Sequence, residues 1–166
     1  MGAVESLEVR LPHPDLPAGD WADSYAVSVS RVDLVALDVA KSMFGDVPRW
    51  VRTLLAFRNR IVSLVGLKSA ELKMTGRESI GGFPLLASTG DQALLGFDDW
   101  HLDFRILISV EKISGGRQRV RVTTLVKRHN LFGRIYIFVV TPFHRLIVRS
   151  FLRRFLAAQM VIRQPV

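Results

Sequence analysis

Two stretches of alternating side chains near the middle of the chain constrain the fold more than any other feature. Apolar residues recur at every second position of the first stretch, namely at Trp100, Leu102, Phe104, Ile106, Ile108 and Val110. The second stretch repeats the pattern at Val120, Val122, Thr124 and Val126. A period of two is typical of a strand with one buried face. We therefore predict a hairpin that turns at Ser114-Gly115-Gly116, with its polar face in solvent.

The register of this hairpin follows from its charges. In one register Val110 opposes Val120 and Glu111 opposes Arg119. A shift by two residues keeps the faces matched but places Arg105 opposite Lys127, a like-charge pair. Cross-strand pairs contribute about 0.2–1 kcal/mol each, so we expect the first register and a three-residue loop.

Shorter segments surround the hairpin. We expect an extended leader without regular structure at residues 1–22, followed by one domain at residues 23–166. Strands are predicted at 23–30, 83–89 and 93–97 by alternation. Helices are predicted at 31–44, with Asp33 near its N-cap, and from about 46 to 66, where Pro48 fits the first turn. A stop at Gly45 separates the two helices.

The last predicted element is a long helix from Asn130 to Ala158. Asn130 can cap it, and Pro142 should bend or divide it. Beyond Pro142 one side carries an arginine ridge, and the opposite side is apolar. The ridge contains Arg145, Arg149 and Arg153, and the apolar side contains Phe143, Ile147, Val148, Phe151, Phe155 and Ala158.

Composition excludes several classes of protein. The chain has no cysteine, which excludes disulfides, thiolate metal sites and a cysteine nucleophile. The N-terminus has no apolar signal region, and the longest apolar run, from Ile135 to Val140, is far shorter than the about 20 residues of a membrane span. We expect a cytoplasmic protein.

Charge is divided unevenly along the chain. The formal net charge is +8, and residues 117–166 hold 11 Lys or Arg with no Asp or Glu. Such a basic end can bind an acidic partner or an anionic membrane surface, here through Arg145, Arg149 and Arg153, or it can simply be a solvated face. The basic residues lack interleaved exposed aromatics, so nucleic acid is not an expected partner.

Several motifs carry a family resemblance. The segments Pro48-Arg49-Trp50, His101-Leu102-Asp103-Phe104-Arg105 and Pro142-Phe143-His144-Arg145 resemble those of an uncharacterised bacterial family of unknown function. The order of elements also resembles the START-type (SRPBCC-like) helix-grip fold. That resemblance implies an α+β class, with a curved antiparallel sheet gripping the C-terminal helix and a helix pair after the first strand.

Five residues are candidates for binding a small molecule. A helix gripped by a sheet often leaves an apolar cavity with a few polar groups. We expect Trp100, Phe104, Tyr136 and His144 to line it, and Arg58, in the middle of the second helix, to meet an acid, a carbonyl or a ligand anion. His144 is either a polar anchor or a satisfied structural histidine near the helix bend.

Catalytic and metal chemistry have weaker support. His101 and Asp103 share a predicted strand face, but two ligands at this spacing are common by chance, so we expect no metal and no cofactor. No serine can be linked to His129 or His144 as a nucleophile. The sequence leaves three hypotheses open: an apolar-ligand or lipid binding module, an interaction domain with a basic surface, and a cyclase- or dehydratase-type enzyme that uses His144.

Overall fold

A single antiparallel sheet and two helices make up the described part of the chain. The computed structural model describes residues 3–45, 49, 53 and 78–161. Within them the strand order is β1-β2-β7-β6-β5-β4-β3. The strands are β1 (Glu5–Leu7), β2 (Trp21–Val29), β3 (Ser79–Ile80), β4 (Phe83–Ser88), β5 (Gln92–Asp98), β6 (Leu102–Ile113) and β7 (Arg117–Arg128). The helices are α1 (Ala36–Phe44) and α3 (Leu131–Val161).

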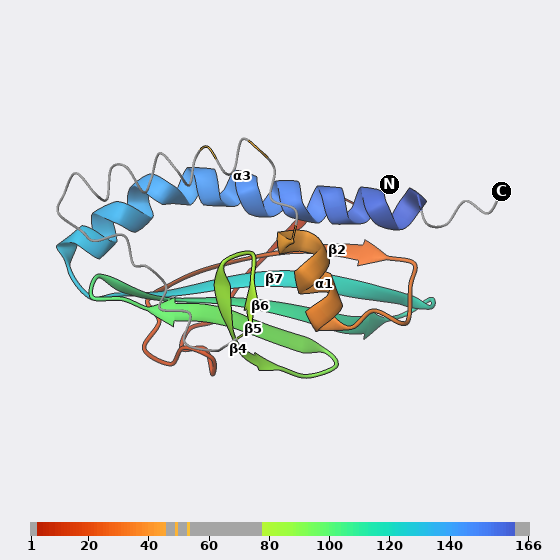
Figure 1. Ribbon diagram of the computed structural model, residues 1–166, viewed down its shortest axis with the longest axis horizontal. Helices are drawn as coiled ribbons and strands as arrows, with labels where there is room; N and C mark the ends of the chain where they lie inside the picture. Colours follow the sequence, from red (N-terminus) through yellow and green to blue (C-terminus); the bar gives the residue numbers. More distant parts are fainter. Residues whose placement is uncertain (1–2, 46–48, 50–52, 54–77, 162–166) are drawn as a thin grey trace.

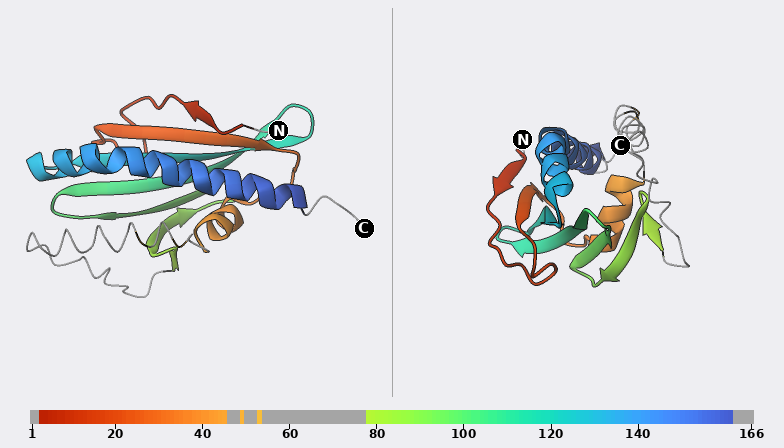
Figure 2. Two further views of the ribbon diagram at one scale, coloured as in Figure 1. Left: turned by 90° about the horizontal axis from the view of Figure 1, so that it is seen from above. Right: turned by 90° about the vertical axis from the view of Figure 1, so that its left-hand side faces the viewer.

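The two helices lie on the same face of the sheet. In Figure 1 the long α3 runs above the sheet along its strands, and the short α1 lies beside it over β5 and β6. Figure 2 shows the N-terminal segment passing along β2 and then beneath the sheet, on the side opposite α3. The expected α+β class, with a sheet, a long C-terminal helix and a short helix after the first predicted strand, is confirmed.

The predicted register of the central hairpin is confirmed. Val110 pairs with Val120, and Glu111 pairs with Arg119. β6 ends at Ile113 and β7 begins at Arg117, which leaves the expected three-residue loop. In that loop Gly115 and Gly116 have φ values of 76° and 64°, a conformation that residues with a Cβ rarely adopt.

The buried residues between the helices and the sheet form two clusters. The larger cluster lies beneath α1 and the C-terminal half of α3, where Val148, Phe151, Leu152 and Phe155 are buried. The smaller cluster lies beneath the N-terminal half of α3 and is built on Leu102, Val126 and Ile137, with Trp21, Phe104 and Tyr136 packed against it.

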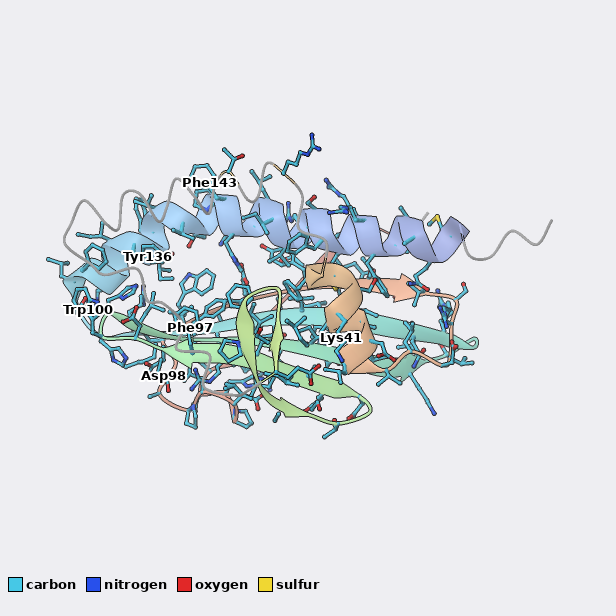
Figure 3. The ribbon with its side chains drawn as sticks, in the orientation of Figure 1. Lys41, Phe97, Asp98, Trp100, Tyr136 and Phe143 are labelled. Carbon is cyan, nitrogen blue, oxygen red and sulfur yellow. The ribbon has the colours of Figure 1, made fainter. Side chains whose placement is uncertain are left out.

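The helix α3 is continuous through Pro142 and is therefore not divided. Asn130 caps it as predicted, because its side-chain Oδ1 accepts a hydrogen bond of 2.9 Å from the N–H of Gly133. The apolar side was predicted with two errors, since Phe143 and Ala158 are exposed. Figure 3 shows Phe143 on the side of α3 that faces away from the sheet.

The first helix begins later than its periodicity suggests. Asp33 was predicted near the N-cap, but α1 starts at Ala36 and its N-cap, Val35, makes no side-chain bond. Asp33 instead pairs with Arg31, whose Nε donates a hydrogen bond of 2.8 Å to Asp33 Oδ1. The N–H of Leu34 donates to Gln118 Oε1 at 2.9 Å, which ties this stretch to β7 as extended chain. The predicted helix at 46–66 lies outside the described residues, apart from positions 49 and 53.

Three further expectations are wrong. The leader is not without regular structure, because β1 pairs with β2. Trp100 does not begin the strand, because β6 starts at Leu102 and Trp100 lies in the preceding loop. The sheet face opposite α3 is not uniformly solvated, since Leu107, Thr123 and Leu125 are buried there, on the side where the N-terminal segment passes.

The first turn of α3 packs closely on the β5–β6 loop. A Cβ placed on Gly133 would overlap the carbonyl oxygen of His101, which no side chain tolerates. Glycine at this position therefore permits the close approach that brings the start of α3 onto the end of the sheet.

We predict that Gly133→Ala destabilises the protein. Alanine favours a helix over glycine by about 1 kcal/mol, but the clash should outweigh this gain and leave a net loss of roughly 1–3 kcal/mol. Urea denaturation measures the free energy of unfolding. Gly90→Ala is the control, because a Cβ there meets no atom within 4 Å. Equal stability of the two variants would contradict this description of the contact.

Candidate functional site

Three polar side chains meet between α3 and the sheet. Asp23 on β2 is the direct cross-strand partner of Thr124 on β7. His144 reaches them from α3, with its Nε2 atom 3.2 Å from Asp23 Oδ1. The side chains of His144 and Asp23 are only 18% and 10% exposed, and Thr124 is 2% exposed. We call these three residues the polar layer.

Strand alternation places the polar layer in an apolar surface. Asp23 has the same parity as Tyr25 and Val27, which are buried beneath the helices. Thr124 likewise lies between Val122 and Val126 on its strand, and both valines are buried. Side chains two residues apart on a strand share a face, so both polar groups point toward α3.

The polar layer separates the two apolar clusters. Trp21 and Val126 belong to the smaller cluster, whereas Tyr25 and Val122, each four residues away on the same strand, belong to the larger one. Phe104 packs against both clusters. The core between α3 and the sheet is therefore interrupted by hydrogen-bonding groups rather than filled continuously by hydrocarbon.

Two oxygens of the polar layer lack a partner. Asp23 Oδ2 and Thr124 Oγ1 are shielded from solvent and accept or donate no hydrogen bond within the described residues. Leaving a buried polar atom unsatisfied costs about 1–3 kcal/mol, and more for a charged group. Native proteins keep few such atoms, and they tend to occur where a ligand, an ion or a water completes the site.

Charged groups beside the polar layer act on Tyr25. Burial and the neighbouring Asp23 carboxylate raise the pKa of Tyr25, while Arg145 and Arg149 act in the opposite direction. The guanidinium carbon of Arg149 lies 5.1 Å from the centre of the Tyr25 ring. The Tyr25 hydroxyl therefore stays protonated at neutral pH, and arginine charge lies close to this end of the polar layer.

The structure brings together some of the candidate residues but not all. His144 belongs to the polar layer, and its ring lies 5.9 Å from the ring of Trp21. Phe104 and Tyr136 both pack on the smaller apolar cluster beside it. Trp100 is 54% exposed at the end of the sheet and does not reach the polar layer, but it stacks on Phe132, which in turn stacks on Tyr136. Arg58 lies outside the described residues.

The other histidines make separate contacts. His101 does not share a strand face with Asp103. It is buried in the β5–β6 loop, with Nδ1 3.2 Å from Asp99 Oδ2, and its ring packs on Tyr136 at 5.5 Å. Asp103 pairs with His129 at 2.8 Å. In the part of the chain that the structure describes, no three His, Asp or Glu side chains gather as metal ligands.

Sequence reasoning missed Trp21, Asp23 and Thr124 as site residues. A signal for two of them was present, because Asp23 and Thr124 are polar residues at positions where strand alternation calls for apolar ones. Their proximity to His144 carried no local signal, since Asp23 and His144 are 121 residues apart in the chain.

The unpartnered hydroxyl gives a prediction with a matched control. Thr124→Val removes a buried hydroxyl without changing the shape of the side chain, so we expect the free energy of unfolding to rise by about 1 kcal/mol. Thr123→Val is the control on the same strand. It removes a hydroxyl that bonds to Ser24 Oγ at 2.9 Å, so it should destabilise by a similar amount. Urea denaturation of both variants measures whether their free energies of unfolding change in opposite directions. A destabilised Thr124→Val would show that this hydroxyl has a partner in the folded protein.

Comparison with known proteins identifies the family but supplies no activity. The profile of the family described as protein of unknown function (DUF2867) matches residues 16–151, most of the chain and nearly all of the sheet. No curated protein matches the sequence, and no solved structure matches it either. The chain belongs to the DUF2867 family of proteins of unknown function.

Proposed function

We propose that this protein is a binding module for a small apolar molecule or lipid, and that the polar layer anchors the polar end of that ligand. The observation that carries the proposal is the pair of unpartnered oxygens, Asp23 Oδ2 and Thr124 Oγ1, buried in an otherwise apolar region. Ligand sites are mostly apolar and carry a few convergent polar groups that fix orientation. The START-type helix-grip architecture, with a cavity between sheet and C-terminal helix, is part of this proposal.

The chemistry of the polar layer restricts the ligand's polar end. An ionised Asp23 can only accept hydrogen bonds, whereas the Thr124 hydroxyl can donate one and accept others. A ligand that satisfies both oxygens must bring at least one donor, as a hydroxyl or an amine does. A carboxylate would place a second negative charge beside Asp23 in a region of low dielectric, so it is disfavoured.

The aromatic residues beside the polar layer suit an apolar ligand body. Trp21, Phe104 and Tyr136 pack around the smaller cluster, which lies directly next to Asp23 and His144. Phe104 also lies near Phe97 and Phe83, with ring centres 5.6 and 5.7 Å apart respectively. A ligand anchored at the polar layer would extend among these rings, whose faces offer large contact area at small entropic cost.

Native mass spectrometry tests the proposal. The freshly purified protein should carry a bound small molecule that is released on denaturation. After it is stripped of ligand, the protein should bind 1-dodecanol in preference to dodecanoate, because only the alcohol donates a hydrogen bond at neutral pH. A clean mass, with no binding of either probe, would argue for a core filled by side chains and against the proposal.

The two threonine variants sharpen this test. We expect Thr124→Val to weaken 1-dodecanol binding about tenfold, which corresponds to one lost hydrogen bond, even though it stabilises the fold. Thr123→Val removes a hydroxyl that faces away from α3, so this variant should retain binding although it is less stable. Equal losses in the two variants would mean that binding follows overall stability and not the polar layer.

A second candidate function is acid–base catalysis of the cyclase or dehydratase type. It is favoured by the pairing of Asp23 with His144, because a carboxylate hydrogen-bonded to one imidazole nitrogen fixes the orientation of the ring. If His144 is the acid or base, His144→Ala would retain ligand binding and lose turnover, whereas full activity of that variant would exclude the role.

A further inference from the structure

The outward side of the N-terminal half of α3 is apolar and exposed. Phe138 is 82% exposed, and Figure 3 shows Phe143 projecting from the same half of the helix away from the sheet. The residues of this exposed apolar face are Leu131, Ile135, Phe138, Val139, Phe143 and Leu146, each between 47% and 82% exposed. Contiguous apolar surface of this kind marks an interaction site more often than isolated exposed residues do.

Basic residues continue this surface toward the C-terminus. Arg145, Arg149, Arg153 and Arg154 are all exposed on α3, and we call these four the arginine row. The helix contains no acidic residue, and the chain has none after Glu111. The surface therefore joins an apolar half to a basic half along one helix.

The apolarity of α3 exceeds what the core requires. From Leu131 to Met160 the helix is long and apolar enough to cross a membrane by length and composition, yet only 17% of its most apolar window is buried. Its other side packs on the sheet through Val148, Phe151, Leu152 and Phe155. A helix held by a sheet on one side and apolar on the other is suited to lie along a membrane surface rather than to span it.

We propose that α3 docks this protein on an anionic lipid bilayer. The exposed apolar face enters the boundary between headgroups and acyl chains, and the arginine row binds the phosphates. Association of two copies through α3 would bring together helices whose charges are all positive, with no acid to pair them. An anionic bilayer offers both an apolar layer for Phe138 and negative charge opposite the arginine row.

Sedimentation with lipid vesicles tests this docking. The full chain should bind vesicles of two parts phosphatidylcholine to one part phosphatidylglycerol at least tenfold more strongly than phosphatidylcholine alone. Binding should fall as salt is raised, because the phosphate contacts are screened. Equal binding to both vesicles, or none to either, would overturn the proposal.

Single substitutions measure the separate contributions of the apolar face and the arginine row to vesicle binding. Phe138→Asp should weaken binding about tenfold through lost apolar burial, and Arg153→Glu by a similar factor through charge reversal. The controls are Val32→Asp, at a 61% exposed position before α1, and Arg117→Glu, at the exposed first residue of β7. Both controls make the same kind of chemical change outside the exposed apolar face and the arginine row, and they should bind as the wild type does.

Two measurements distinguish membrane docking from self-association and from ligand anchoring. Size-exclusion chromatography should give the same elution volume for wild type and Phe138→Asp. If the variant instead converts a dimer to a monomer, the apolar face is an interface between copies and the docking proposal fails. Thr124→Val should leave vesicle binding unchanged, so failure of ligand anchoring and failure of membrane docking are distinguishable.

Discussion

The pairing of β6 with β7 is the constraint on which the rest of the structure depends. Twelve residues of each strand pair in a single register, and this register decides which side chains face α3. A slip by one residue would turn Thr124 and its valine neighbours away from the helix and bring Arg121 and Thr123 toward it. On its other edge β7 pairs with β2, and the register of that second pairing sets Asp23 opposite Thr124. The polar layer therefore follows from the sheet's register and not from any local motif.

The helix α3 serves two surfaces at once. Its inner side covers the two apolar clusters. Between these clusters His144 contacts Asp23, which lies beside Thr124 on the sheet. On its outer side the helix presents apolar residues and then arginines to solvent. The inner arrangement supports the anchoring of a small apolar ligand, and the outer arrangement supports contact with anionic lipid. Both proposals are consistent with exchange of a lipid between membrane and protein, although each is tested separately.

The sequence predicted the fold more fully than the site. Alternation specified the β6–β7 hairpin, its register and its turn, because these depend on neighbours in the chain and on simple charge pairing. Helical spacing, which also depends only on neighbours in the chain, placed His144 on the side of the last helix that faces the sheet. The sequence did not place Asp23 beside His144, because contact between segments 121 residues apart depends on packing. It misplaced Trp100 because the alternation continues into the loop, where the backbone is no longer extended. It misassigned Phe143 because an outward apolar residue near Pro142 has the same pattern as a core residue.

The most direct test of the central claim is a high-resolution crystal structure of the protein purified without removal of bound molecules. We expect electron density for an organic molecule whose hydroxyl or amine donates to Asp23 Oδ2 and contacts Thr124 Oγ1, with its apolar part beside Trp21 and Phe104. A direct hydrogen bond between Thr124 and Asp23, with side chains filling all the space between α3 and the sheet, would contradict the claim. In that case the polar layer would be a structural feature of the core.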